Sequence, residues 1–337
     1  MHSFAEHTTF RLGGEADQWL THTDRRAWPD IVRAVRTRPF VLGGGSNLLP
    51  GDGRYLGTVV RMATRGTELR HSGDEQVDVT AQAGVPLGDL VTRTVAEGLS
   101  GIEYLTGIPG TVGAAPVQNA GAYGQQIGDH LVALTVWDWA RARTDRMNTT
   151  ACQLGYRTSV FKARPGRWTI LDVTFRLTRS RRAAPVTYGH LASALDVPLG
   201  HRPPLAEGAA GVAADRQARG LSLPTGGPDA RQAGSAFLNP VLDTASAARV
   251  SALGGQVYRD ADGQQRASAG SLLELCGYSP GRRIGAGVYC STARTLTVTA
   301  RDGASATAVR GALRTMAQQV RDSAGVQLAP EPVCPHA

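Results

Sequence analysis

The stretch TGIPGTVGAAPVQNAGAYG (Thr106–Gly124) decides the fold of this 337-residue chain. Glycines recur through it and two prolines interrupt it, which excludes an ordinary helix and a central strand. Because glycine and alanine carry little or no side chain, a long flat ligand can lie against such a backbone and hydrogen-bond to its amides. An irregular connection of this length inside a compact domain is usually functional.

A second glycine-rich stretch, VLGGGSNLLP (Val41–Pro50), comes earlier in the chain. Its three consecutive glycines follow an apolar strand, and successive amides in such a turn can bind phosphate. The spacing matches neither the Rossmann G-x-G-x-x-G pattern nor the Walker pattern. Phosphate binding and a plain tight turn both remain open for this stretch alone.

The rest of the chain alternates between helical and strand patterns. Helices are expected at 28–35, 86–99, 188–195, 211–221, 271–278 and 309–320, and strands at 38–42, 57–62, 76–84, 131–139, 171–180 and 294–300. In the strand at 171–180, Val173, Phe175 and Leu177 alternate with polar residues, which predicts one solvated face. The basic segment TRSRRAAP (Thr178–Pro185) is the best candidate for a domain boundary.

Charge and composition narrow the class of protein. The formal net charge is +8, which favours anionic ligands. No basic run interleaved with aromatic residues and no zinc-ligand spacing occurs, so we expect neither nucleic acid nor metal. No signal peptide or membrane-spanning run is visible, and four scattered cysteines suggest reduced thiols, so we expect a cytoplasmic protein. Of 36 lysines and arginines only Lys162 is lysine.

Six motifs in order, TTFRLGGEA, VLGGGSNLL, GIEYLTGIPGTVGAAPVQNAGAYG, YRTSVFK, GSAFLNP and PEPV, resemble the UDP-N-acetylenolpyruvoylglucosamine reductase (MurB) family over almost the whole chain. The segment TYGHL resembles the type I form of that family. The resemblance implies an α+β protein with an FAD-binding domain of the vanillyl-alcohol-oxidase (PCMH) type. Its two subdomains would cover 1–55 and 56–180, and an α+β substrate-binding domain would cover 181–337.

The resemblance also implies the ligands and the residues that hold them. FAD and NADPH are the expected cofactors, and a nucleotide-sugar is the expected substrate. The catalytic residues would be Arg157, which stabilises negative charge, Ser235, which donates a proton, and Glu331, which helps to polarise or protonate the intermediate. The substrate would be contacted by Tyr123, Tyr188, Arg219 and Asn239. The FAD-binding residues would be Leu42, Gly43, Gly44, Gly45, Ser46, Asn47, Leu48, Thr106, Ile108, Pro109, Gly110, Thr111, Gly113, Ala114, Asn119 and Gly121.

The implied activity is the NADPH-driven reduction of the enolpyruvyl ether of UDP-N-acetylglucosamine enolpyruvate by a monomeric enzyme of peptidoglycan synthesis, and so of cell-wall growth, shape and division. The sequence departs from the family pattern near the serine, where Ala236 replaces an aromatic residue and Leu238 a polar one. A paralogue that reduces another enolpyruvyl or unsaturated nucleotide-sugar, and a non-catalytic flavoprotein, are the alternatives. Lys162 would either pair with an anionic ligand or brace its loop.

Overall fold

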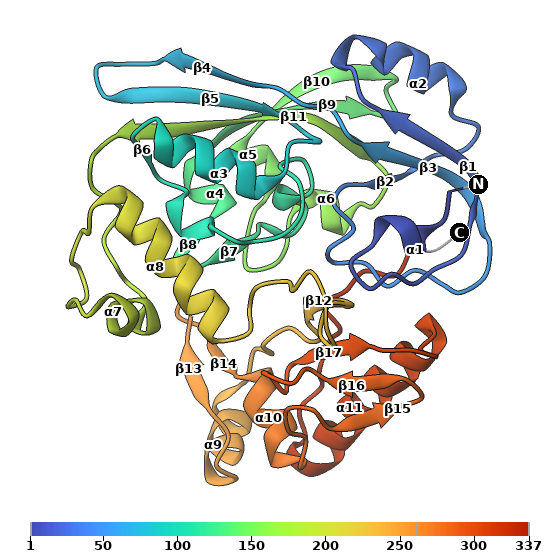
Figure 1. Ribbon diagram of the computed structural model, residues 1–337, viewed down its shortest axis with the longest axis vertical. Coiled ribbons are helices and arrows are strands. Elements are labelled where there is room, and N and C mark those ends of the chain that lie inside the picture. Colours follow the sequence, from blue (N-terminus) through green and yellow to red (C-terminus); the bar gives the residue numbers. More distant parts are fainter. Residues whose placement is uncertain (1, 261, 336–337) are drawn as a thin grey trace. The chain divides into compact units, whose positions relative to one another are not determined.

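The computed structural model describes residues 2–260 and 262–335, and the chain forms two compact units (Figure 1). Unit 1 consists of residues 1–15, 45–55 and 219–337, and unit 2 of residues 16–44 and 56–218. The glycine stretch at 41–50 therefore passes from one unit to the other between Gly44 and Gly45. The expected three-domain division, with boundaries at 55 and 180, is a different partition and stays a prediction.

Unit 2 is built on a six-stranded antiparallel sheet of order β10-β9-β11-β5-β4, with β6 added to β11. A three-stranded sheet of order β1-β3-β2 lies beside it, with β2 and β3 parallel. The elements of this unit are β1 (Ala16–His22), η1 (Arg25–Ala27), α2 (Trp28–Ala34), β2 (Phe40–Leu42), β3 (Tyr55–Met62, whose first residue belongs to unit 1), β4 (Thr67–His71), β5 (Gln76–Gln82), α3 (Leu87–Ala96), β6 (Leu99–Ser100), η2 (Glu103–Leu105), η3 (Ala115–Gln118), β7 (Gly121–Ala122), β8 (Gln125–Gln126), α4 (Ile127–His130), β9 (Leu131–Asp138), β10 (Arg143–Asn148), α5 (Thr149–Cys152), α6 (Val160–Ala163), β11 (Trp168–Arg179), α7 (Gly189–Leu195) and α8 (Leu205–Ala218).

Helix α3 covers one face of the large sheet because its apolar side, Leu87, Leu90 and Val91, is buried in the same cluster as strands β5, β9 and β11 (Figure 1). The periodic spacing of these leucines and valines is what predicts the helix. After α3, β6 and η2 the chain enters the long segment 106–124, whose regular structure is the short turn η3 and the two-residue strand β7. The expectation that this segment is irregular is confirmed.

Strand β11 corrects one expectation from the sequence. Asp172 and Thr174, expected on a solvated face, are both buried, whereas Arg176, expected on the same face, is exposed. Arg25 forms a 3.0 Å ion pair with Asp172, and the hydroxyls of Thr174 and Thr80 lie 2.9 Å apart. Alternation alone cannot show that the polar face of a strand is covered by partners of matching polarity.

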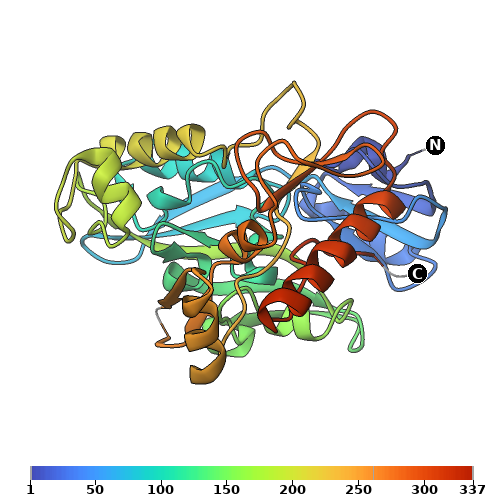
Figure 2. The same ribbon diagram turned by 90° about the horizontal axis from the view of Figure 1, so that it is seen from below.

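Unit 1 contains a four-stranded antiparallel sheet of order β12-β17-β16-β15, a separate hairpin of β13 and β14, and the long helix α11. Its elements are α1 (Phe4–His7), β12 (Gln232–Ser235), α9 (Thr244–Ala252), β13 (Val257–Arg259), β14 (Gln265–Ala267), α10 (Ala269–Leu275), β15 (Arg283–Gly285), β16 (Val288–Cys290), β17 (Thr297–Ala300) and α11 (Ala306–Ala324). Figure 2 shows α11 lengthwise, at the red end of the colour scale.

Helix α11 confirms the stripe expected near the C-terminus. Val309, Leu313, Met316 and Val320 are buried in one apolar cluster with β16, β17 and α10. Ser305 caps the helix through its hydroxyl, which accepts from the amide of Ala308. No helix within the described residues combines the length and the apolar character needed to cross a bilayer.

Candidate active site

The two glycine-rich stretches meet in unit 2, at residues 43–44 and 110–114. A Cβ atom added to Gly44 would lie 2.9 Å from Cα of Gly110, and one added to Gly113 would lie 2.5 Å from Cβ of Ala83. Both distances are shorter than van der Waals contact, so only glycine lets these backbones approach. The residues expected to hold a cofactor are therefore brought together here by bare main chain.

Backbone hydrogen bonds fix the second stretch against the sheet. The amides of Val112 and Gly113 donate to the carbonyls of Val85 and Ala83, at 2.8 and 2.9 Å, and Leu87 donates to the carbonyl of Gly110 at 3.0 Å. The segment thus takes its shape from the connection between β5 and α3, in addition to its own turns.

A cavity opens at this junction, with a volume of about 90 Å³. Glycine backbone and small side chains line one part of it, and large apolar residues line the other; the lining is Val41, Gly43, Met62, Ala83, Thr111, Gly113, Ala114, Val117, Phe161, Trp168 and Ile170. A flat, largely apolar group suits this combination of small residues and apolar wall, while the amides of Gly113 and Ala114 are already bonded to the carbonyls of Ala83 and Thr111. The cavity is smaller than the roughly 300 Å³ that ligand pockets usually reach, so its lining fits the edge of a flavin ring and not the whole ring.

Arg157, expected to be catalytic, lies in a strained turn beside this region. Its backbone is left-handed, with φ of 53°, a conformation that costs about 1 kcal/mol or more for a residue with a side chain. Its guanidinium donates to the carbonyl of Gly121 at 3.0 Å. The turn is therefore held by the same stretch, 106–124, that forms the glycine junction.

Lys162 holds the other side of that turn. Its ammonium donates to the carbonyl of Arg157 at 2.9 Å, and α6, on which it lies, is capped by the hydroxyl of Ser159. The hydroxyl of Ser159 also donates to the carbonyl of Val117 at 2.6 Å. In this structure the one lysine of the chain therefore braces the loop that carries Arg157, which is one of the two roles that the sequence left open.

Asn119, expected to bind the cofactor, is buried and its side chain is engaged within the protein. Its amide group donates to Gln126 at 2.9 Å and to the carbonyl of Gly155 at 3.2 Å, and its oxygen accepts from the amide of Gly128 at 2.9 Å. These bonds tie the glycine stretch to the segment that leads to Arg157. A cofactor contact by Asn119 stays a prediction.

Tyr123 and Tyr188, both expected at the substrate, lie against each other with ring centroids 5.4 Å apart. Tyr123 is buried and donates its hydroxyl to Asp215 at 2.7 Å, whereas Tyr188 is more than a third exposed. Sequence reasoning missed Asp215 and its neighbour Arg216, both buried on α8. The sequence did carry a signal for them, because two adjacent charged residues stand out in an alanine-rich helix.

Ser235 and Glu331, expected to be catalytic, come together in unit 1. The amide of Glu331 donates at 3.0 Å to the carbonyl of Ala236, the residue that follows Ser235. Phe237 and Pro330 also form a bridge, so the strand end at β12 and the C-terminal segment run antiparallel. Both side chains are half-buried.

The second half of the glycine stretch 41–50 contacts the segment that carries Glu331. Asn47 donates its side-chain amide to the carbonyl of Glu331 at 3.2 Å, and its own carbonyl accepts from the amide of Val333 at 2.9 Å. Leu48 bridges to Val333. Residues 45–48, expected to bind the cofactor, are thus held by the segment that carries Glu331.

Asn239 and Arg219, the remaining expected substrate residues, belong to unit 1 as well. The side chain of Asn239 donates to the hydroxyl of Tyr258 at 2.7 Å and accepts from the amide of Ala269 at 2.9 Å. Arg219 follows α8 and is half-buried. Their contact with a substrate stays a prediction.

Comparison with known proteins covers both units. Residues 24–146 match the family model described as FAD binding domain, and residues 227–335 match the C-terminal domain of UDP-N-acetylenolpyruvoylglucosamine reductase. These matches agree with the expected fold class.

Curated relatives match almost the whole chain. Proteins named UDP-N-acetylenolpyruvoylglucosamine reductase from Salinispora arenicola and Thermobifida fusca are 40% and 39% identical to it, each over 98% of this chain and over 93% and 95% of their own. A crystal structure titled as the MurB reductase of Thermus caldophilus aligns with a TM-score of 0.67 at 24% identity, over 99% of this chain and 97% of that one. The structural match shows a shared fold.

Proposed function

We propose that this chain, which belongs to the UDP-N-acetylenolpyruvoylglucosamine reductase family, reduces the enolpyruvyl ether of UDP-N-acetylglucosamine enolpyruvate to the lactyl ether of UDP-N-acetylmuramate. When bound, FAD supplies the hydride that it has received from NADPH. The observation that carries the proposal is the pairing of the two segments that carry Ser235 and Glu331, which are far apart in the chain and are joined by the bond from the amide of Glu331 to the carbonyl of Ala236.

The glycine junction of unit 2 would hold the flavin ring. Glycine at positions 43, 44 and 113 lets the two stretches and Ala83 pack closely against one another, and Phe161 and Trp168 supply an apolar wall that would exclude water. A dry wall matters because electrostatic interactions with the reacting group are stronger where water is excluded.

Arg157 would stabilise the charge that develops on the substrate. Hydride addition to C3 of the enolpyruvyl group leaves negative charge at C2 and on the adjacent carboxylate, and a fixed guanidinium lowers the energy of that charge. The bonds from Arg157 to Gly121 and from Lys162 to Arg157 orient the arginine in advance, so little reorganisation is needed during the reaction.

Ser235 would deliver the proton to C2, which completes the addition of one hydride and one proton across the double bond. A serine hydroxyl is a weak acid and acts only when a carbanion develops close by. Within the described residues its hydroxyl has no hydrogen-bond partner, so it is available to a ligand. Glu331 would polarise the intermediate and help to restore the proton of the serine.

Ala236 bears on the alternative of a paralogue with another substrate. Its side chain is buried in the apolar cluster of unit 1, so the loss of an aromatic residue at this position changes the packing beneath the serine and does not open the surface beside it. The leading proposal therefore needs no change of substrate. We further propose a monomeric cytoplasmic enzyme that serves cell-wall growth and, through it, cell shape and division.

A two-step stopped-flow measurement tests the function. Anaerobic NADPH should bleach the flavin absorbance of the purified protein, and UDP-N-acetylglucosamine enolpyruvate should then restore it. NADH in the first step, and the same substrate lacking its enolpyruvyl group in the second, serve as controls. Protein without bound flavin, or reduced flavin that the enolpyruvyl substrate does not reoxidise, would contradict the proposal.

A further inference from the structure

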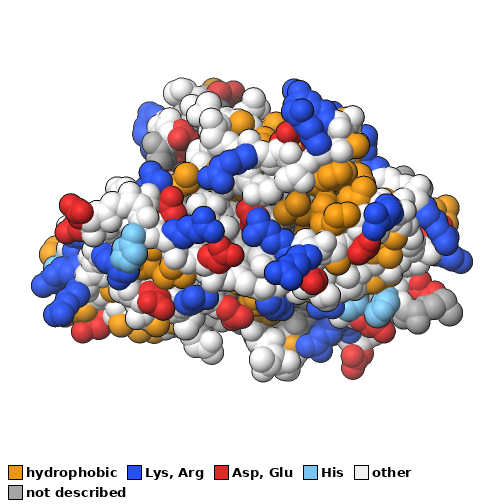
Figure 3. All heavy atoms as spheres, turned by 90° about the horizontal axis from the view of Figure 1, so that it is seen from above, with side chains coloured by type: hydrophobic (Ala, Val, Ile, Leu, Met, Phe, Trp, Pro, Cys, Tyr) orange, Lys and Arg blue, Asp and Glu red, His pale blue; other side chains and the backbone are white. Residues whose placement is uncertain are grey.

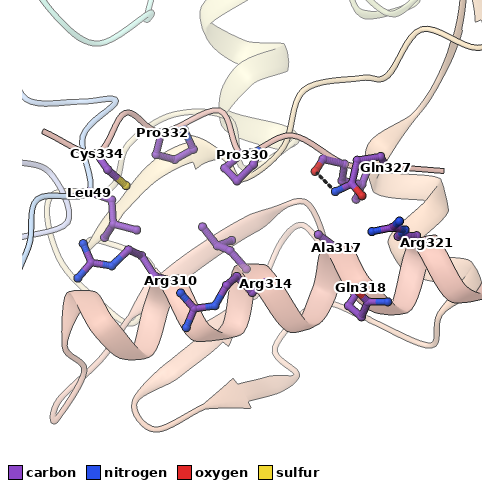
Figure 4. Close-up of a pocket in the computed structure, with 12 residues that line it drawn as sticks. Leu49, Arg310, Arg314, Ala317, Gln318, Arg321, Gln327, Pro330, Pro332 and Cys334 are labelled. Carbon is purple, nitrogen blue, oxygen red and sulfur yellow. Dashed lines mark hydrogen bonds between the residues drawn. The ribbon is translucent and has the colours of Figure 1, made fainter. Parts of the chain in front are cut away.

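A groove runs along α11 in unit 1, between the helix and the C-terminal segment 327–334 (Figure 4). Its volume is about 400 Å³, and Leu49, Leu313, Ala317 and Leu328 supply apolar lining. None of the residues that line it belongs to the catalytic or ligand-binding set described above. The groove is therefore a second concave surface, separate from the candidate active site.

Arginines form the helical rim of the groove. Arg310, Arg314 and Arg321 all line it, and their spacings of four and seven residues place them on one side of the helix. Arg310 lies near the carboxylate of Asp52, whose pKa it helps to lower. Within the described residues Arg314 and Arg321 are exposed and make no ion pair or side-chain hydrogen bond.

No aspartate or glutamate is among the described residues that line the groove. Two lie next to lining residues, since Asp52 is near Arg310 and Asp322 accepts a 2.7 Å hydrogen bond from Gln318. The face shown in Figure 3 carries basic and acidic side chains interspersed over its area. A groove with an apolar floor and two rim arginines that make no ion pair with any described residue, Arg314 and Arg321, complements a ligand that is both apolar and anionic.

The C-terminal segment opposite the helix has no backbone amide at residues 330–333 that could pair with an incoming strand. Pro330 and Pro332 line the groove and have no amide hydrogen, while the amides of Glu331 and Val333 donate to Ala236 and Asn47. An incoming chain therefore cannot add as a strand there. It would be held by side chains, with apolar groups against the prolines and carboxylates against the arginines.

The length of the groove indicates whether a small ion or a peptide would fill it. Arg310 and Arg321 are separated by about 16 Å along the helix axis, at a rise of about 1.5 Å per residue. A chain in the polyproline II conformation covers that length with about five residues, at about 3.1 Å each, and every third side chain lies on the same side. Arg314 and Arg321, about 10 Å apart on the same measure, match carboxylates three residues apart in such a chain.

We propose that this groove binds an acidic, apolar segment of a partner protein, in the polyproline II conformation and with two carboxylates three residues apart facing Arg314 and Arg321. Association is driven by burial of the apolar side chains and directed by the charges at the rim. Because the arginines are exposed, the contribution of charge falls as ionic strength rises.

Fluorescence anisotropy of a labelled peptide, Leu-Glu-Leu-Pro-Glu-Leu, tests the proposal with the full-length protein. Saturable binding is expected, with affinity weakened about tenfold by the double variant Arg314→Glu/Arg321→Glu, which removes and reverses two exposed charge pairs. The matched control Arg26→Glu/Arg36→Glu changes the net charge equally on exposed arginines of unit 2 and should bind as the parent does. A peptide with lysine at both acidic positions should not bind.

Circular dichroism and flavin absorbance should show that both double variants are folded. The proposal is overturned if the parent protein does not bind the peptide, or if the groove variant binds it as tightly as the parent. It is also overturned if the control variant loses as much affinity, since attraction would then be non-specific. Binding of phosphatidylglycerol vesicles without binding of the peptide would assign the surface to a membrane and reject a peptide partner.

Discussion

The two units hold their functional residues in different ways. In unit 2 the glycine junction is formed by stretches whose composition is visible in the sequence, and the six-stranded sheet supports it. In unit 1, the segments that carry Ser235, Glu331 and Asn47 are far apart in the chain, and hydrogen bonds from Glu331 to Ala236 and between Asn47 and residues 331–333 join them. The comparison shows that local composition can encode the glycine junction, whereas the placement of two catalytic residues depends on which distant segments meet.

Gly113→Val tests the glycine junction of unit 2 and should have the largest effect on the protein. A Cβ at this position would lie 2.5 Å from Cβ and 2.9 Å from Cα of Ala83, so the backbone must shift, at a typical cost of about 1–3 kcal/mol. We expect purified protein that has lost its flavin absorbance.

Gly88→Ala is the matched control for that variant. No atom lies within 4 Å of a Cβ added at Gly88, which is inside α3, where alanine favours the helix by about 1 kcal/mol. This variant should stay yellow and melt at a higher temperature. Equal flavin content in the two variants would show that close backbone approach is not required.

Ser235→Ala tests the catalytic pair of unit 1. Loss of the proton donor should slow reoxidation of the flavin by the enolpyruvyl substrate by about 10²–10⁴-fold, while reduction by NADPH stays near normal. Stopped-flow absorbance measures both steps separately. If both steps slowed alike, Ser235 would be a structural residue and not a proton donor.

Asp138 in unit 2 and Asp52 in unit 1 allow the electrostatics of the two units to be compared. In unit 2, burial alone would raise the pKa of Asp138, but hydrogen bonds from the amides of Arg141 and Ala140 and from the guanidinium of Arg167, at 2.8 Å, lower it. In unit 1, burial again opposes the shift, and hydrogen bonds from Thr307 and Ala306 lower the pKa of the exposed Asp52. Because both folded pKa values lie below the unfolded value, each stabilising contribution is complete above pH about 4 and is lost as the pH falls through the folded pKa.

Asp138→Asn should therefore destabilise more than Asp52→Asn at neutral pH. Removal of the buried carboxylate leaves the partly exposed Arg167 without its counter-charge, which we expect to cost about 2–3 kcal/mol, the range for hydrogen bonds to charged groups, whereas the exposed Asp52 should cost less than about 1 kcal/mol. Urea unfolding at pH 7 and at pH 3 measures both differences, which should shrink at the lower pH. Equal costs at pH 7 would remove this contrast between the units.

Lys162→Arg should have the smallest effect. A guanidinium is larger and flatter than an ammonium and fits the single carbonyl of Arg157 less well, so the turn that carries Arg157 should be held less firmly. We expect flavin reoxidation to slow several-fold, on the order of 1 kcal/mol, with flavin content unchanged. Full activity would show that the lone lysine has no geometric role.

The sequence by itself determined the glycine stretches, the expected helices such as α3 and α11, and the resemblance that assigns the family. These features are local: the spacing of apolar residues and the absence of side chains act within a few residues of the chain. It also determined which residues to expect at the site, from motifs at Arg157, Ser235 and Glu331.

Only the tertiary structure decided how those residues are held. Asp172 meets Arg25 and Thr174 meets Thr80 only in the folded chain, and the bond from Lys162 to Arg157 follows from one turn. The segments of Ser235 and Glu331 are joined by a backbone bond from Glu331 to Ala236. Such contacts depend on which segments meet after the chain has folded, and the sequence of each segment carries no record of its partner.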